Sequence, residues 1–319
     1  MKRRQLISCA SLATIPSLSW AQSAKPIRLI VPFPAGGPTD LVARIVAEPL
    51  GRLLGQPVIV DNKGGAGGSI GTAELARAQP DGLTFGIASV STHGVNPVVY
   101  KKLAYDPIKD FAPVCELCKA PVNLVVHPSL PVTTVAEFIA YLKKNPGKVA
   151  YGSPGNGSNN HMLAELFKSA TNTFMLHIPY RGTGPAMVDL LSGQIQVYFD
   201  QVASSIANVK SGKLRSLAVS WHQRLDILPS VPTFAEASLF ANNNPSWFGL
   251  LAPAKTPEAE IQRVNQAVLR GLAEPAIKER FAQLGLFASG GTALQLGALI
   301  QKELNTMSRV AKFAKISLD

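Results

Sequence analysis

The chain has 319 residues, of which 46% are hydrophobic and 16% are charged, and this balance excludes a wholly disordered protein. The length is too great for one minimal domain and suits two α/β lobes. The 31 basic and 20 acidic residues give a formal net charge of +11, but no basic run with interleaved aromatic residues appears, so we expect no nucleic-acid partner.

The first residues have the pattern of an export signal. Three basic residues at positions 2–4 precede an apolar region at 6–18, and a small-x-small cleavage site ends at Ala21. We therefore expect residues 1–21 to be a signal peptide that is cleaved near Ala21, by either the general or the twin-arginine route. Proline, glycine or charge interrupts each later apolar stretch, so we expect a soluble mature chain.

The stretch 27–40 predicts a strand, an open glycine loop and the start of a helix. Its apolar beginning is typical of a buried strand, which two prolines end. Gly36 and Gly37 allow the loop to turn, and the helix that follows can be capped by Thr39 or Asp40. Such a junction directs unpaired N–H groups and the positive helix end at one point, which suits an anionic ligand. An ordinary connection in an α/β sheet has the same pattern.

The next segments alternate between strands and helices. We expect a strand at 57–61, a glycine-rich loop before a helix at 69–78, and a strand at 83–88. This order favours a parallel sheet with helices on both faces. Ligands of such sheets bind at the carboxyl ends of the strands, so the polar segment 89–94 is a candidate wall of a site.

A second series repeats this arrangement. A capping box at Thr134 and Glu137 starts a helix, and a strand at 149–152 leads through the loop 153–160 into a helix that begins at His161. Further strands and helices complete a second sheet.

The helices after residue 256 have no sheet of their own, so we expect them to pack on the first lobe. The predicted first lobe is therefore discontinuous and comprises residues 22–125 and 222–319, whereas the second comprises 126–221.

Cys115 and Cys118 form a C-x-x-C pair within a segment that has the pattern of a strand. An oxidising compartment could close them into a disulfide. Residues three apart on a strand point to opposite faces and lie too far apart for a disulfide without a turn. Structural filling of the strand and a disulfide stay as alternatives, and a catalytic redox pair is disfavoured.

One motif is typical of an enzyme. Residues 67–71, Gly-Gly-Ser-Ile-Gly, match the G-x-S-x-G pattern of serine hydrolases, with Ser69 as the nucleophile. A long loop separates this motif from the preceding strand, whereas a nucleophile elbow turns directly off its strand, so the match is disfavoured. The five histidines show no paired ligand spacing and no complete dinucleotide or phosphate loop is present; we expect no metal and no cofactor.

Several motifs that are spread over the chain occur together in one known family. They are Val-Pro-Phe-Pro-Ala-Gly-Gly-Pro-Thr-Asp at 31–40, Gly-Ala-Gly-Gly at 65–68, Leu-Ala-Tyr-Asp-Pro-Ile-Lys-Asp-Phe at 103–111, Gly-Asn-Gly-Ser at 155–158 with His161, Pro-Tyr-Arg-Gly at 179–182, and Ser-Trp-Phe-Gly-Leu at 246–250. In this combination the chain resembles the periplasmic solute-binding proteins of tripartite tricarboxylate transporters, the Bug-type receptors. The resemblance covers essentially the whole mature chain.

The resemblance implies an α/β fold like that of type II periplasmic binding proteins, with two lobes around a ligand cleft and a double-crossing hinge. It implies a monomeric periplasmic receptor rather than an enzyme. Such a receptor closes on a small carboxylate, which can be a dicarboxylate, an acidic amino acid, a citrate-like acid or an aromatic acid, and delivers it to membrane permease subunits. A ligand-sensing module for a signalling partner stays as an alternative.

The resemblance also implies a ligand position between the two glycine loops, with polar segments as further walls. The expected ligand-binding residues are Phe33, Ala35, Gly36, Gly37, Thr39, Asp40, Ser91, Thr92, His93, Gly155, Asn156, Gly157, Ser158, Asn160, His161, Arg181 and Asp200. For several of them a structural role is an open alternative. Each histidine is either a scaffold residue or a contact. Arg181 either clamps a carboxylate, braces the lobe surface or pairs with Asp200. Asp200 either accepts a hydrogen bond from a ligand amino or hydroxyl group or caps the next helix.

Overall fold

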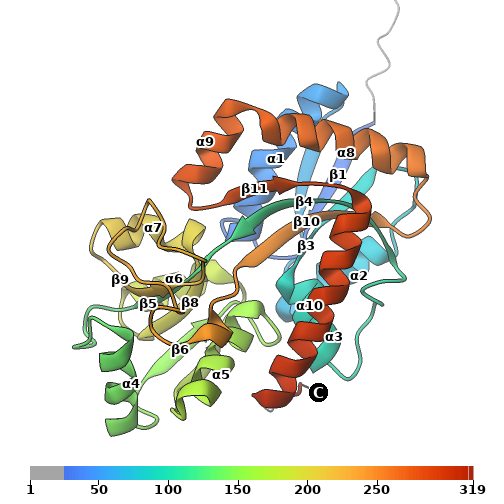
Figure 1. The fold of residues 1–319 in the computed structure, drawn as a ribbon. Coiled ribbons are helices and arrows are strands. Elements are labelled where there is room, and N and C mark those ends of the chain that lie inside the picture. The colour runs from blue at the N-terminus through green and yellow to red at the C-terminus, as the bar shows by residue number, and fades with distance from the viewer. Residues whose placement is uncertain (1–24, 315, 319) are drawn as a thin grey trace, which may run out of the picture.

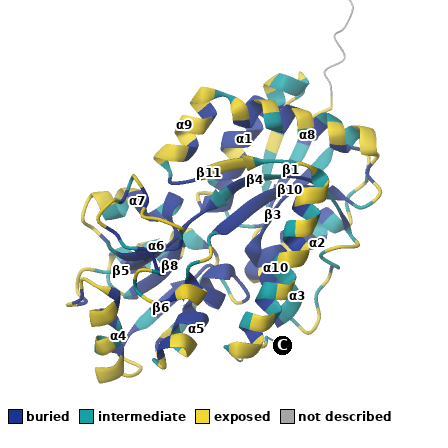
Figure 2. Ribbon diagram, viewed as in Figure 1, coloured by how far each residue is buried: buried dark blue, intermediate teal, exposed yellow. Residues whose placement is uncertain are grey.

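The computed structural model describes residues 25–314 and 316–318, so the expected signal peptide at 1–21 lies outside the described residues. Two α/β lobes, each built on its own sheet, lie side by side (Figure 1). Buried residues fill the central strands of the two sheets and the inner faces of the helices, while the edge strand β11 and the outer faces of helices such as α8, α9 and α4 are exposed (Figure 2).

The first sheet has six strands in the spatial order β11, β4, β10, β3, β1, β2. Its strands are β1 (Ile27–Val31), β2 (Val58–Asn62), β3 (Thr84–Ser89), β4 (Phe111–Ala120), β10 (Ser246–Pro253) and β11 (Phe287–Gly290). The strands β2, β1 and β3 run parallel, as the alternation of strands and helices predicts. The rest of the sheet is antiparallel, because β10 returns from late in the chain and pairs antiparallel with both β3 and β4, and β11 pairs antiparallel with β4.

The second sheet has five strands in the order β7, β6, β8, β5, β9. Its strands are β5 (Val122–Val126), β6 (Ala150–Ser153), β7 (Leu176–Pro179), β8 (Val197–Gln201) and β9 (Arg215–Val219). The strands β7, β6 and β8 are parallel, and β5 is antiparallel to both of its neighbours. Thus β6 occupies the place in the second lobe that β1 occupies in the first, and each is followed by a glycine loop and a helix.

Helices cover both faces of the first sheet. They are α1 (Pro38–Leu54), α2 (Ser69–Ala76), α3 (Asn96–Val99), α8 (Glu258–Ala273), α9 (Pro275–Gln283) and α10 (Ala293–Phe313), with the short helices η1 (Ala66–Gly68) and η2 (Ser91–Val95). On one face, α1, α8 and α9 share a core with the strands; on the other, α2 and α10 do so. The C-terminal helices therefore pack on the first sheet, and burial of their apolar faces is the main force that holds them there.

The helices of the second lobe are likewise divided between the two faces of its sheet. They are α4 (Val135–Lys144), α5 (Asn159–Thr171), α6 (Thr183–Leu191), α7 (Val202–Lys210) and the short η3 (Phe240–Asn242). The capping box predicted at α4 is present, since the Thr134 side chain accepts a hydrogen bond from the backbone N–H of Glu137, and the Glu137 carboxylate accepts from that of Thr134.

The chain passes between the lobes twice. The strand β5 already pairs in the second sheet, and buried side chains between 225 and 239 still belong to the cores of the second lobe. We therefore propose that one crossing lies near Pro121 and the other within 243–245, in place of the expected boundaries at 125 and 222.

Cys115 and Cys118 are both free and buried in β4, where they belong to the core that α1 and α8 cover. Burial raises the pKa of the Cys115 thiol to about 12 and that of Cys118 further, so neither is a reactive thiolate. Within residues 25–314 and 316–318, no helix combines the length and the apolar character that a membrane crossing requires.

Candidate functional site

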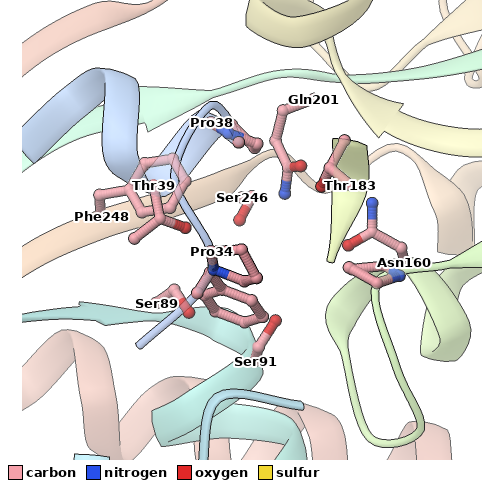
Figure 3. A pocket seen from close by; sticks show the side chains of 13 residues that line it. Pro34, Pro38, Thr39, Ser89, Ser91, Asn160, Thr183, Gln201, Ser246 and Phe248 are labelled. Atoms are coloured by element: carbon pink, nitrogen blue, oxygen red, sulfur yellow. The ribbon is translucent and has the colours of Figure 1, made fainter. Parts of the chain in front are cut away.

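A pocket lies where the two lobes meet, and we refer to it as the inner pocket. Its empty space, part of which is open to solvent, is about 380 Å³. The first lobe lines it with Phe33, Pro34, Gly37, Pro38, Thr39, Ser89, Ser91 and, from β10, Ser246 and Phe248. The second lobe lines it with Pro154, Asn160, Thr183 and Gln201. Figure 3 shows Asn160, Thr183 and Gln201 on one side of this space and Thr39, Ser89 and Ser91 on the other.

The first wall of the inner pocket is the loop between β1 and α1. The helix begins at Pro38, and its N-cap is Gly37, which offers no side chain to the first N–H groups. The expected cap at Thr39 or Asp40 is therefore wrong. The Asp40 carboxylate instead accepts hydrogen bonds from the Gly36 backbone N–H at 2.9 Å, from Arg44 Nε at 2.9 Å and from Asn62 Nδ2 at 3.0 Å.

Asp40 thus stabilises the β1–α1 loop through its hydrogen bond with the Gly36 backbone N–H. Its side chain is 4% exposed. Although burial acts in the opposite direction, the three hydrogen-bond donors and the charge of Arg44 together lower the pKa of this carboxyl below its ordinary value. An ionised Asp40 fixes the loop so that the N-terminal turn of α1 faces the pocket.

The second wall is the loop between β6 and α5. Ser158 is the N-cap of α5, and its hydroxyl accepts from the His161 backbone N–H at 3.3 Å and donates to the Gly155 carbonyl at 2.7 Å. The Asn160 side chain donates from Nδ2 to the Phe199 carbonyl at 2.6 Å, so its amide is held at the pocket edge by the neighbouring strand β8.

Two further helices of the second lobe also begin at the inner pocket. The helix α6 starts at Thr183 and has Gly182 as an N-cap without a side-chain hydrogen bond. The helix α7 has Gln201 as its N-cap, likewise without a side-chain cap. Thr183 and Gln201 both line the pocket.

The inner pocket is therefore electropositive without a cation. Four helices, α1, α5, α6 and α7, have residues of their N-terminal turn or N-cap in its wall, and each helix carries about half a positive charge at that end. None of the lining residues is an aspartate, glutamate, lysine, arginine or histidine. The Ser89 hydroxyl is buried without a partner among the described residues. This arrangement suits an anion that accepts hydrogen bonds from neutral donors.

The lobes are closed around the inner pocket. The Asn159 backbone N–H of the second lobe donates to Ser91 Oγ of the first at 2.9 Å. The Tyr100 hydroxyl of the first lobe donates to the Asn156 carbonyl of the second at 2.8 Å. Both contacts connect the β6–α5 loop with the region of η2 and α3, so they seal one side of the cleft.

The two histidines nearest the expected site, His93 and His161, pack against other rings of the scaffold. The π-helical turn η2 buries His93 against Tyr105 and Phe111, and this burial lowers its pKa to about 3. His161 stacks on His177 with ring centroids 4.1 Å apart, and burial lowers the pKa of His161 as well. Both rings are neutral at pH 7, and neither lines the inner pocket.

Asp200 lies behind the pocket wall. Its carboxylate is fully buried, accepts a hydrogen bond from Ser204 Oγ at 2.6 Å through Oδ2, and has no partner at Oδ1 among the described residues. Burial raises its pKa to about 7. It does not pair with Arg181, which is exposed on the loop before α6. The alternative that these two residues pair is therefore wrong.

The structure brings only part of the expected set together. Of the expected ligand-binding residues, the inner pocket contains Phe33, Gly37, Thr39, Ser91 and Asn160. A second inter-lobe pocket contains Gly155 and Arg181. Those that line neither pocket are Ala35, Gly36, Asp40, Thr92, His93, Asn156, Gly157, Ser158, His161 and Asp200.

Sequence reasoning missed several lining residues. These are Pro34, Pro38, Pro154, Thr183, Gln201, Ser246 and Phe248, whereas Ser89 lies in the segment 89–94, which the sequence predicts as a candidate wall. Pro34, Pro38 and Pro154 lie within the two predicted glycine loops, and Ser246 and Phe248 lie in the motif at 246–250. The sequence indicates Thr183 and Gln201 only weakly, because its one clue is that each lies between a predicted strand and a predicted helix of the second lobe.

Comparison with known proteins places these observations in a family. The sequence model described as "Tripartite tricarboxylate transporter family receptor" matches residues 42–316. A UPF0065 protein from the TAR-I ttuE-ttuC' intergenic region of Agrobacterium vitis is 36% identical over 309 residues, which are 95% of this chain and 89% of that protein. Protein BugT of Bordetella pertussis is 36% identical over 290 residues, which are 91% and 89% of the two chains.

Solved structures are similar over nearly the whole length. A periplasmic transporter has a TM-score of 0.91 at 43% identity, covering 94% of this chain and 100% of its own. Rpa4515 of R. palustris with adipate has a TM-score of 0.89 at 34% identity, with 93% and 99% covered. MatC from Rhodopseudomonas palustris with bound malate has a TM-score of 0.86 at 32% identity, with 90% and 98% covered. The chain therefore has the two-lobed fold of these periplasmic binding proteins.

Proposed function

The chain belongs to the tripartite tricarboxylate transporter receptor family, and from this membership we propose that it captures a small carboxylate in the inner pocket and delivers it to membrane permease subunits of a tripartite transporter. The convergence of four helix N-termini on a pocket without charged side chains carries this proposal. A carboxylate there replaces its hydration shell with backbone N–H groups and the polar side chains of the wall.

Members of this family and its structural neighbours are substrate-binding receptors, not enzymes. The serine hydrolase alternative is therefore wrong. Ser69, its expected nucleophile, begins α2, and the part of the chain that the structure describes shows no histidine hydrogen-bonded to it.

We propose dicarboxylates as the first ligands to test. Two relatives with TM-scores of 0.86 or more have adipate or malate bound. In this chain the seven side chains of Thr39, Ser89, Ser91, Asn160, Thr183, Gln201 and Ser246 give the inner pocket polar groups on several sides. Such a wall can hydrogen-bond to a carboxylate at one end of a ligand and to further polar groups along the length of the ligand.

The direct test is a thermal-shift and calorimetric screen of the mature protein with malate, adipate, acidic amino acids, citrate and aromatic acids. A ligand at a hundred times its dissociation constant should add about 2.7 kcal/mol to the free energy of unfolding. If no carboxylate in the panel shifts the transition, the proposed ligand class is refuted.

A charge placed in the pocket tests the location of the site. Asn160→Asp keeps the shape of the side chain but adds a negative charge to the wall, so it should weaken carboxylate binding at least about tenfold. Asn242→Asp is the matched control, because Asn242 is also buried and also donates from Nδ2 to a backbone carbonyl, that of Leu163 at 3.0 Å, away from the pocket. Equal binding losses in the two variants would place the ligand elsewhere.

We propose that the protein works in the periplasm as a monomer after cleavage near Ala21. N-terminal sequencing of the exported protein should give Gln22 as the first residue, and a start at Met1 would contradict cleavage. Co-purification with permease subunits in the presence of ligand tests the delivery role. Capture of a sensor protein instead would favour the sensing alternative.

A further inference from the structure

A second space between the lobes, which we refer to as the outer pocket, adjoins the inner pocket. It encloses about 1090 Å³, part of it open to solvent. It is lined by Phe33, Pro34, Asn62, Gly64, Gly65, Ala66 and Ile70 of the first lobe and by Pro154, Gly155, Tyr180, Arg181 and Gly182 of the second. Phe33, Pro34 and Pro154 line both pockets, so they form the wall between them.

This wall is made by contact between the two lobes. The Pro34 ring of the first lobe lies against Gly182 of the second so closely that a Cβ on Gly182 would be 2.8 Å from Pro34 Cγ. Two hydrogen bonds also join the lobes, one from Tyr100 to the Asn156 carbonyl and one from the Asn159 N–H to Ser91. Parting of the lobes would break the contact between Pro34 and Gly182 and would join the outer pocket to the inner one.

Arg181 is the cation of the outer pocket. It is exposed, and the described residues provide no hydrogen bond or ion pair to its guanidinium. Other cations of the surrounding loops are engaged: Arg44 pairs with Asp40 at 2.9 Å, and Lys63 lies 3.6 Å from Asp61. The carboxylate of Asp189 in α6 is engaged as well, because it accepts a hydrogen bond from the Tyr180 hydroxyl at 2.7 Å.

We propose that the outer pocket is a capture site in which Arg181 attracts the incoming carboxylate before it passes into the uncharged inner pocket. The proposal rests on the proposed function. The inner pocket binds through short-range donors that reach only a ligand already in place, because helix-end fields fall off within about one turn. A full, unpaired charge at the mouth acts over the Debye length, which is about 30 Å at 0.01 M salt and about 3 Å at 1 M. Steering of this kind raises the association rate and leaves the dissociation rate unchanged.

The test is stopped-flow binding of the tightest dicarboxylate of the panel, with malate and adipate as the first probes. At about 0.01 M salt, Arg181→Ala should lower the association rate constant by about threefold or more, and Arg181→Glu should lower it further. At about 1 M salt these differences should disappear. Arg181→Lys should bind at nearly the wild-type rate, because steering needs the charge and not the planar fork of arginine.

Arg270→Ala on α8 is the matched control, because it removes another exposed arginine from the first lobe and changes the net charge equally. Unchanged association rates in Arg181→Ala, or the same loss in Arg270→Ala, would overturn the proposal. A faster dissociation in both Arg181→Ala and Arg181→Lys would also overturn it, since that result identifies a fork that grips the bound ligand. If the wild-type protein itself binds no carboxylate, the proposed function fails instead.

Discussion

Asp200 was expected to contact the ligand, but it lies buried behind the wall of the inner pocket. The sequence placed it after a strand, where ligands of α/β proteins lie. In the structure, the next residue, Gln201, faces the inner pocket, and Asp200 faces the interior, since neighbouring residues of a strand point to opposite sides. Its full burial, with one carboxylate oxygen left without a partner among the described residues, makes the ionised form unfavourable.

Because the ionised Asp200 carboxylate is unfavourable in the folded protein, we expect the free energy of unfolding to depend on pH. The pKa of Asp200 is about 7 in the folded protein against an ordinary value of 3.8, so between about pH 4 and pH 7 the folded state keeps a proton that the unfolded chain has lost. The free energy of unfolding therefore falls as the pH rises through this window. Asp200→Asn removes the effect, so its stability relative to wild type should increase by on the order of a few kcal/mol from pH 4 to pH 8.

Urea unfolding of both proteins at the two pH values measures this difference. Asp226→Asn is the control, because it changes an exposed aspartate of the segment that packs on the same lobe. A stability difference that is the same at pH 4 and pH 8 would show that Asp200 is ionised without penalty.

At the scale of elements, the sequence allowed the repeated unit of strand, glycine loop and helix to be predicted in both lobes, because prolines, glycines and apolar periodicity act locally. The loops 33–40 and 153–161 do line one pocket. The contributions of Thr183 and Gln201 could not be predicted, because they depend on how the starts of α6 and α7 are brought together by the order of the second sheet. The position of His93 could not be predicted either, because it depends on a π-helical turn, which has no clear sequence signal.

The close contact of Gly182, in the loop before α6, with Pro34 of the other lobe leads to a prediction about closure. Gly182 has a φ of +110°, and a Cβ there would collide with Pro34 of the other lobe. Gly182→Ala should therefore hold the lobes apart and weaken ligand binding by about tenfold or more, through strain of about 1 kcal/mol or more and a lost contact.

Gly184→Ala is a close control, because it lies two residues later in α6 and a Cβ there has no neighbour within 4 Å. Isothermal calorimetry of both variants gives the dissociation constants. If Gly182→Ala binds as well as Gly184→Ala, the contact between Pro34 and Gly182 does not contribute to closure.

At the scale of the molecule, the closed arrangement depends on contacts between lobes that share only two chain crossings. Ligand binding is expected to shift the population from open to closed forms, because the closed form alone surrounds the ligand with donors from both lobes. The radius of gyration measured by X-ray scattering should fall when ligand is added.

Tyr100→Phe tests which contacts hold the closed form. It removes the hydrogen bond from the Tyr100 hydroxyl to the Asn156 carbonyl, which is worth about 1 kcal/mol, so several-fold more ligand should be needed for the same decrease in radius. Tyr141→Phe on α4, in the second lobe, is the control. A titration of Tyr100→Phe that coincides with that of Tyr141→Phe would exclude this hydrogen bond as a determinant of closure.

The central place of β10 in the first sheet also affects how the protein is made. This strand begins at Ser246 and lies between β3 and β4, so a nascent chain that is still short of that residue leaves both of them with an unpaired edge. Translation must therefore be at least three-quarters complete before β3 and β4 can gain this shared neighbour, and nearly complete before β11 can pair with β4. Truncated products that end before Ser246 should expose apolar strands to proteases and chaperones.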